Sequence, residues 1–254
     1  MYIDTMTEPY TQGRWLIFTE DSVASTQAWV REGVVALSDR SVILAGTQSV
    51  GRGRSGREWK SPPGGFYTSF LLKPSPPLVS APCISLLAAV VLARLLKKRG
   101  IVASVKWPND VIVNDKKMAG IIAEAGSFPE SWFILGIGVN LTSAPPLQNR
   151  KFLPAGCWAE FGDSPSPGRL LNEFLMELDV SWRNKEDDPM EGISSELNSI
   201  LWRKGEQVSL LGGDDNIGGI ITGVDHNGSL VLLTDSGERR FVSGELRTVP
   251  DERR

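Results

Sequence analysis

The chain has 254 residues, enough for one large domain or for a medium domain followed by a small one. Its net charge of −3 provides no global positive field, which argues against nucleic acid as the main partner. Its two cysteines, Cys83 and Cys157, are far apart and form no Cys-x-x-Cys pair, a usage typical of a reduced, cytoplasmic protein.

The first 18 residues are short and mixed in character. They show no signal peptide, and we expect no helix-turn-helix domain because the segment is too short to hold one. The entry of a helix is predicted over residues 22–29, where hydroxyl residues suit an N-cap and Ala28 and Trp29 continue the helix. Two interpretations stay open: Ser25 and Thr26 cap this helix, or they bind a small polar ligand beside its free backbone donors.

Strands are predicted over residues 41–46 and 66–72 from their β-branched and apolar residues. A long helix is predicted over about residues 79–99, with basic residues at its C-terminal end and Gly100 as its cap. The apolar run within this helix, about residues 84–96, is too short to span a bilayer, so we expect a buried core helix and no membrane partner.

The segment between the strands at residues 41–46 and 66–72 is rich in arginine and glycine. We call its residues 51–57 the arginine loop, and they contain three of each: Gly51, Arg52, Gly53, Arg54, Ser55, Gly56 and Arg57. Arginine forks fit phosphate and carboxylate groups, and glycine lets the backbone approach a ligand closely. We interpret the segment as a mobile loop that closes on an anionic, phosphate-bearing ligand.

Two glycine-rich motifs are disfavoured for this loop. A dinucleotide fingerprint needs a helix after its third glycine, which Pro62 and Pro63 prevent. A P-loop needs Lys-Ser/Thr where this chain has Arg57-Glu58. The alternatives left open are a solvated basic loop and a short nucleic-acid-contacting segment.

A second polar stretch, residues 105–124, is typical of a strand, a proline turn, a strand, an Asn-Asp hairpin turn and a further strand. Asp110 is either a general base or a residue that holds the turn. Lys117 is either a fixed charge facing a ligand or a surface lysine beside the hairpin. Another strand is predicted over residues 132–141, and the succession of strands predicts a mixed, mostly antiparallel central sheet backed by helices, an α+β fold.

The sequence pattern changes after residue 142. Residues 143–167 are predicted to be an irregular linker, followed by an amphipathic helix over residues 170–182 and a shorter helix over about residues 193–202. Beyond Gly205, four short strands separated by Gly-, Asp- and Asn-containing turns predict a small β-barrel.

We therefore expect two domains, residues 1–203 and residues 204–254, with the polar motifs in the first. The one histidine, His226, lies in a predicted hairpin turn, which disfavours a histidine-based triad or zinc site. Arginines on a flexible loop and a lysine on a strand can together enclose phosphates and stabilise an in-line attack on phosphorus. No residue is an obvious covalent nucleophile, which favours a reaction in which the substrate supplies the nucleophile.

Four motifs in this order resemble the biotin protein ligase family: Gln-Ser-Val-Gly-Arg-Gly-Arg-Ser-Gly-Arg-Glu-Trp at residues 48–59, Lys-Trp-Pro-Asn-Asp at 106–110, Lys-Met-Ala-Gly at 117–120 and Gly-Ile-Gly-Val-Asn at 136–140. The resemblance covers about residues 19–249 and includes Ser243-Gly244-Glu245 of the C-terminal barrel. It implies a class II synthetase-like catalytic domain that binds biotin and ATP, followed by an SH3-like barrel.

The resemblance also implies the activity of a biotin–[acetyl-CoA-carboxylase] ligase, assisted by magnesium. In the first step the biotin carboxylate attacks the α-phosphate of ATP, giving biotinyl-adenylate and pyrophosphate. In the second step a lysine of a biotin carboxyl carrier domain attacks the adenylate, and AMP leaves. A reactive mixed anhydride must be shielded from water, which suits a mobile loop.

Carried over by position, the resemblance implies three catalytic residues: Lys117, Arg54 and Asp110. Lys117 would reach between the biotin carboxylate and the α-phosphate, and Asp110 would orient or deprotonate the incoming lysine. The implied biotin-binding residues are Ser25, Thr26, Gln27, Gln48, Arg52, Gly53, Arg54, Lys117 and Gly120. The implied ATP-binding residues are Arg54, Arg57, Trp59, Lys106, Asn109, Lys117 and Asn140. No metal ligand from the protein is implied, and Gln27 stands where the family usually has Asn, which leaves its role open.

Regulatory members of the family carry an N-terminal DNA-binding domain that this chain has no room for, so we expect no repressor function and no nucleic acid partner. Family members often form a homodimer through the central sheet. The alternatives are a lipoate- or octanoate-ligase relative, which the arginine loop and the Lys-Trp-Pro-Asn-Asp motif disfavour, and a non-catalytic biotin- or nucleotide-binding regulator, which the joint presence of Arg54, Lys117 and Asp110 disfavours.

Overall fold

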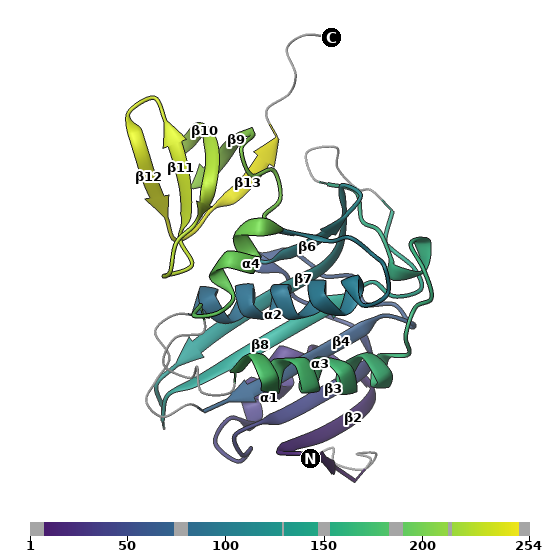
Figure 1. Cartoon of the computed structure of the whole chain (residues 1–254). Helices are drawn as coiled ribbons and strands as arrows, with labels where there is room; N and C mark the ends of the chain where they lie inside the picture. Colours follow the sequence, from purple (N-terminus) through teal and green to yellow (C-terminus); the bar gives the residue numbers. More distant parts are fainter. Residues whose placement is uncertain are drawn as a thin grey trace.

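The computed structural model describes residues 8–73, 81–128, 130–146, 153–182, 190–212 and 215–248. Within these ranges the strands form one large and one small sheet (Figure 1). The strands of the large sheet, in spatial order, are β1 (Tyr10–Gln12), β2 (Trp15–Val23), β3 (Ser41–Gln48), β4 (Phe66–Leu72), β8 (Trp132–Val139), β7 (Lys116–Gly126), β6 (Asp110–Val113) and β5 (Ser104–Lys106).

The large sheet is antiparallel except for the parallel pair β2 and β3, which confirms the predicted mixed, mostly antiparallel α+β architecture. The predicted hairpin between β6 and β7 is present, and both of its turn residues, Asn114 (φ 48°) and Asp115 (φ 55°), are left-handed. Asn and Asp tolerate this conformation better than other non-glycine residues, so the sequence placed this turn correctly.

Helices cover both faces of the large sheet. On one face lie α2 (Ala81–Lys97) and α3 (Pro167–Trp182), which contact each other (Figure 1). On the other face lies α1 (Thr26–Gly33). The alternation of strand side chains explains this arrangement, because Val42 of β3 packs in the α2–α3 core whereas its neighbour Ile43 packs with Val30 of α1.

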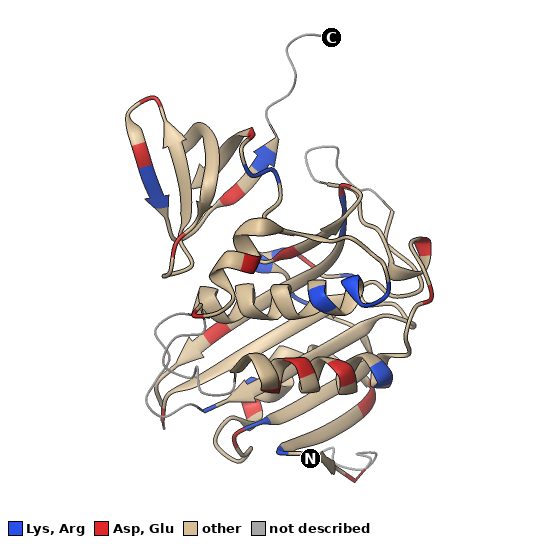
Figure 2. Ribbon diagram, viewed as in Figure 1, with Lys and Arg blue, Asp and Glu red and all other residues tan. Residues whose placement is uncertain are grey.

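Helix α2 is almost entirely buried, as expected for the longest apolar run of the chain. Its last residue is Lys97, and the predicted cap Gly100 is left-handed at φ 74°, which allows Ile101 N to donate to Leu96 O at 3.0 Å. The basic residues that follow its last turns face acidic residues of α3, as the ion pairs Lys98–Glu177 and Arg99–Glu173 show (Figure 2).

The N-terminal part of the chain differs from its prediction. The pattern of residues 1–18 gave no strand, whereas β2 runs to Val23 and places Trp15 and Ile17 in the main core. The helix therefore begins later than Ser22, with Ser25 as its N-cap. Strand β2 is hard to recognise because its second half is mostly polar and is partly buried or exposed.

The C-terminal strands form an open antiparallel sheet. Its strands, in spatial order, are β12 (Gly237–Phe241), β11 (Leu230–Thr234), β10 (Asp215–Val224), β9 (Gln207–Gly212) and β13 (Glu245–Thr248). The end strands β12 and β13 do not pair in the described residues, so the predicted barrel is not closed by hydrogen bonds, and β13 is a fifth strand that the sequence pattern did not reveal. Four residues are too few to show a reliable alternation.

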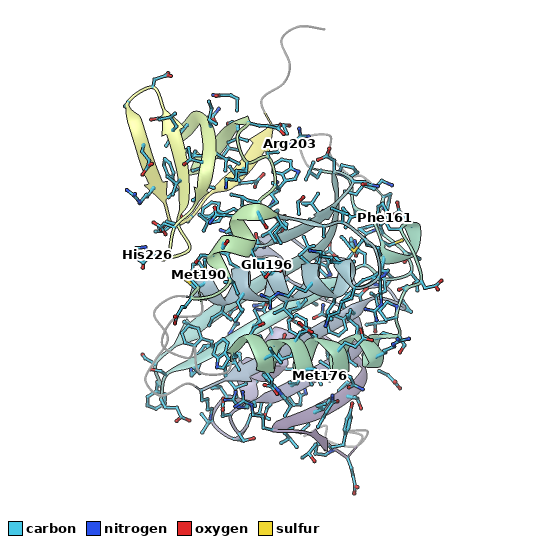
Figure 3. The ribbon with its side chains drawn as sticks, viewed as in Figure 1. Phe161, Met176, Met190, Glu196, Arg203 and His226 are labelled. Atoms are coloured by element: carbon cyan, nitrogen blue, oxygen red, sulfur yellow. The ribbon has the colours of Figure 1, made fainter. Side chains whose placement is uncertain are left out.

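Both sheets share contacts around α4 (Ser194–Ser199), the short helix that precedes the small sheet. The Trp107 indole donates to Gly228 O at 2.9 Å, and the Asn198 side chain exchanges two 2.9 Å hydrogen bonds with the backbone of Val224. Glu196 of α4 pairs with Arg94 of α2, and His226 lies exposed in the β10–β11 turn, as predicted (Figure 3). The division at residues 203 and 204 stays a prediction.

The helices that the structure describes are too short or too polar to cross a membrane. Among the described residues, none of them combines the length and the apolar character that crossing a bilayer requires.

Candidate active site

A single cavity of about 270 Å³ brings the predicted site residues together. Its wall combines the start of α1, the end of β3, the arginine loop, the β5–β6 turn and the middle of β7 and β8. Every predicted residue lines it: Ser25, Thr26, Gln27, Gln48, Arg52, Gly53, Arg54, Arg57, Trp59, Lys106, Asn109, Asp110, Lys117, Gly120 and Asn140.

The cavity also has lining residues that the sequence prediction missed. Gly136 and Gly138 belonged to a recognised motif without being assigned to the site, and Pro145 and Pro146 come from the predicted linker. Gly244 immediately precedes β13, and residues 245 and 246 begin that strand. Sequence spacing gave no reason to place them near the arginine loop.

Glycines in neighbouring strands make the floor of the cavity. Gly120 of β7 is the register partner of Gly138 of β8, and the Trp59 indole lies on both. A Cβ at Gly138 would lie 2.5 Å from Trp59 Nε1, and a Cβ at Gly120 would lie 2.9 Å from the same ring. Only glycine at positions 120 and 138 therefore allows the Trp59 ring to lie on the sheet. In this position the buried Trp59 Nε1 has no hydrogen-bond partner among the described residues.

Gln27 extends under the same sheet. Its side chain is 5% exposed and its Nε2 lies 3.5 Å from Ile122 O. A Cβ at Gly136 would come within 2.8 Å of this side chain, so glycine at 136 provides the room that the long amide needs. Ser25 acts as the helix cap, since its Oγ accepts from Ala28 N at 3.5 Å.

Thr26 and Gln48 form the polar end of the cavity. Gln48 Oε1 accepts from Thr26 N at 2.8 Å and from Thr26 Oγ1 at 3.1 Å. Gln48 Nε2 donates to Ser61 Oγ at 2.8 Å, and Thr26 Oγ1 accepts from the buried Ser69 Oγ at 2.8 Å. These bonds hold both side chains in one orientation.

Lys117 and Asp110 meet at the centre of the cavity. Lys117 Nζ lies 2.7 Å from Asp110 Oδ1, an ion pair whose angles are not those of a hydrogen bond. The same Nζ lies 5.4 Å from the centroid of the Trp59 ring, within the range of a cation–π contact.

The arginine loop is folded back on itself at the cationic end. Gly53 N donates to Arg57 O at 2.6 Å, and the short 3₁₀ turn η1 (Arg54–Gly56) contains two left-handed residues, Ser55 (φ 56°) and Gly56 (φ 71°). Arg54 Nη1 donates to Asn109 Oδ1 at 3.2 Å. Arg57 Nη1 lies 3.1 Å from Glu245 Oε2, so β13 holds the loop from the other sheet.

The cavity wall carries more positive than negative charge. It is lined by six cations and three carboxylates: Arg52, Arg54, Arg57, Lys60, Lys106 and Lys117 against Glu58, Asp110 and Glu245. Burial lowers the pKa of Arg54 and of Lys106 below their usual values, and Asp110 partly opposes this for both. Cations that have lost part of their hydration gain from an anionic ligand, which phosphates or carboxylates would supply.

Asn140 is buried at the end of β8. Its Nδ2 donates to Gly156 O at 3.0 Å and its backbone carbonyl accepts from Trp158 N at 2.9 Å. Asn140 therefore holds the segment that covers this side of the cavity, and its predicted contact with a nucleotide stays a prediction.

Known protein families and structures match this chain over most of its length. A model of the biotin/lipoate A/B protein ligase family matches residues 21–140, and one of the biotin protein ligase C-terminal domain matches residues 205–246. A biotin–[acetyl-CoA-carboxylase] ligase of Paracoccus denitrificans is 33% identical over 87% of this chain and 96% of its own length. The corresponding ligase of Mycobacterium tuberculosis is 30% identical over 80% of this chain and 76% of its own length. Among solved structures, a biotin protein ligase of Aquifex aeolicus in complex with biotin and ATP matches with a TM-score of 0.79 and 28% identity, over 92% of this chain and 99% of that one.

We expect Gly138→Ala to lower the free energy of unfolding by about 1–3 kcal/mol, because the added Cβ overlaps the Trp59 ring. Urea denaturation measures this change. In a Trp59→Ala background the overlap is gone, and the same substitution should cost much less. Gly168→Ala is the matched control, since a Cβ at Gly168 meets nothing within 4 Å. An equal cost of Gly138→Ala in both backgrounds would contradict the contact.

Proposed function

We propose, because this chain belongs to the biotin protein ligase family, that it is an ATP-dependent ligase that activates biotin as biotinyl-AMP and transfers the biotinyl group to a carboxylase. The transfer forms an amide with a lysine of a biotin carboxyl carrier domain. The observation that carries this proposal is a single cavity with two chemically different ends, a polar one at Thr26 and Gln48 and a cationic one at the arginine loop.

The polar end fits the head group of biotin. Gln48 Nε2 has a second N–H beyond the one given to Ser61, and Thr26 Oγ1 has a lone pair beyond the one that Ser69 occupies. A donor beside an acceptor matches the C=O and N–H that stand side by side on a cyclic urea. Lipoate and octanoate have no such edge, so they would leave both groups unsatisfied, which costs affinity.

The cationic end fits the reacting carboxylate and the phosphates. Lys117 would leave Asp110 and bind the biotin carboxylate and an α-phosphate oxygen. Its charge would then neutralise the negative charge that grows as the carboxylate oxygen attacks phosphorus and pyrophosphate leaves. Arg54, held by Asn109, and Arg57, held by Glu245, would bind phosphate oxygens. A regulator that only binds biotin has no need for such a charge between the two ends.

Asp110 is proposed to serve the second step. When Lys117 turns to the substrates, the buried Asp110 Oδ1 loses its counter-ion and becomes free to accept a proton or a hydrogen bond. The incoming lysine amine must lose a proton before it attacks the acyl carbon and AMP departs. The arginine loop, held to β13, would keep water away from the mixed anhydride meanwhile.

Magnesium is the expected companion of ATP. It prefers oxygen ligands and in nucleotide sites is held by phosphates and one or two carboxylates. In the described part of the chain no three His, Cys, Asp or Glu side chains gather into a metal site, whereas Glu58, Asp110 and Glu245 line the cavity. These residues fit an ion that arrives on the nucleotide, where it would offset the charge of the phosphates.

The remaining setting of the enzyme is also a proposal. We infer a cytoplasmic protein, which the two buried thiols, in a chain without a disulfide between them, support. We also infer a protein rather than a nucleic acid as its macromolecular partner, which the net charge of −3 supports. A homodimer through the central sheet would not form by pairing at the edge strand β5, because the backbone of Val105 is already hydrogen-bonded to Ile200 and Trp202.

The test of the proposed function is ATP–pyrophosphate exchange with biotin, lipoate and octanoate as separate substrates. We expect exchange with biotin and at most about a thousandth of that rate with the other two acids, since both lack the urea edge. Exchange with lipoate or octanoate instead of biotin would place the chain with the lipoate ligases. A folded protein that exchanges with none of the three would support the binding-only regulator.

Lys117→Met should lower the rate of biotin-dependent exchange by about 10²–10³-fold, because it removes a charge that stabilises the transition state. The matched control is Lys116→Met, since the neighbouring Lys116 pairs with Glu160 at the surface. Near-normal pyrophosphate release by the Lys117 variant would remove Lys117 from the first step.

Asp110→Asn should lower transfer from preformed biotinyl-adenylate to the carrier by about 10²-fold or more, because the base is lost while the shape is kept. A single-turnover assay with isolated adenylate measures this step alone. Asp115→Asn serves as the control, as Asp115 contacts Trp202 and Arg203 outside the cavity. Unchanged transfer by the Asp110 variant would exclude it as base or orienter.

A further inference from the structure

We propose that Ser69, a serine of β4 that does not line the cavity, is a positioning residue for recognition of the urea group, and this rests on the proposed function. Ser69 is fully buried at 0% exposure, and its Oγ lies 2.8 Å from Thr26 Oγ1. It lies 43 positions from Thr26 in the sequence, and none of the four recognised motifs contains it.

The direction of every hydrogen bond around Thr26 follows from one backbone group. Thr26 N can only donate, so the atom of Gln48 that lies 2.8 Å from it is the oxygen, Oε1. That oxygen carries no hydrogen, so the Thr26 hydroxyl, 3.1 Å away, must donate to it as well. Because the one proton of Thr26 Oγ1 is then committed, the Ser69 hydroxyl must be the donor between those two groups.

The other end of Gln48 is fixed in the same way. Its Nε2 donates to Ser61 Oγ at 2.8 Å, and Ser61 Oγ donates to Trp59 O at 3.2 Å. If the Gln48 amide were flipped, its NH2 group would face Thr26 N, and two donors would oppose each other. The amide therefore has one stable orientation. The order of donation, Ser69 to Thr26 and Thr26 to Gln48, therefore cannot reverse.

This order determines what the cavity offers a ligand. With its proton given to Gln48 and one lone pair taken by Ser69, the Thr26 hydroxyl can only accept from a ligand N–H. Successive donation also polarises the hydroxyl, which makes it a better acceptor. Without Ser69, the Thr26 hydroxyl loses this polarisation and one of the contacts that hold its position.

The neighbouring residue provides a matched control. Thr68 is equally buried at 0% exposure, and its Oγ1 donates to Ile43 O at 2.8 Å. It stands on the opposite side of β4 from Ser69 and has no hydrogen bond to Thr26 or Gln48 among the described residues. Thr68→Val removes a buried hydroxyl of the same strand without touching the chain of donors.

The experiment is calorimetric binding of biotin to the full-length protein and to Ser69→Ala and Thr68→Val. We expect Ser69→Ala to weaken biotin binding by about fivefold to thirtyfold, the effect of one buried hydrogen bond, and to leave the KM for ATP unchanged. Thr68→Val should lower stability and bind biotin as the unaltered chain does. Desthiobiotin keeps the urea and lacks the sulfur, so Ser69→Ala should weaken its binding by the same factor as that of biotin.

Three outcomes would overturn the role of Ser69: biotin binding within twofold of the unaltered chain in Ser69→Ala, an equal loss in Thr68→Val, or an equal loss for ATP. Ser69→Cys fills the same space with a weak donor, and it gives the measurement if the alanine variant does not fold. An unaltered chain that binds no biotin would instead overturn the proposed function, so the two failures are distinguishable.

Discussion

The pairing of Gly120 with Gly138 in the middle of the large sheet is the constraint on which the site depends. Side chains at these two positions would fill the space above β7 and β8, where Trp59 now lies. The indole closes the end of the arginine loop onto the sheet and forms one wall beside Lys117. A sheet that is bare at this point can therefore hold both a ligand and the loop that covers it.

Around this floor the cavity separates two kinds of recognition. At one end the direction of each hydrogen bond is fixed by backbone geometry, so the Thr26–Gln48 pair distinguishes ligands by their donors and acceptors. At the other end, arginines on a loop offer planar forks that match phosphate and carboxylate groups, and a lysine on a strand offers a point charge. Lys117 and Asp110 share one ion pair. In the proposed function, an anion that binds Lys117 would release Asp110 from this pair.

Much of the fold could be predicted from the sequence because its signals are local. The strand at residues 66–72, the buried helix with Gly100 as its cap and the left-handed turn at Asn114 and Asp115 each follow from periodicity or turn chemistry. Strands β2 and β13 were not predicted, because half of β2 is polar and β13 has only four residues. The barrel expected at the C-terminus is an open sheet because its end strands do not pair in the described residues.

By itself the sequence determined the chemistry of the site: arginines and glycines in one loop, a lysine and an aspartate on neighbouring strands, and motifs that resemble one family. Only the tertiary structure decided which of these groups touch. Ser69 carries no sequence signal, and the stretch that contains Glu245 resembles the family without indicating its partner, yet each residue lies within contact distance of a motif residue. Contacts between residues 43 or more positions apart depend on strand order and register, which local patterns do not encode.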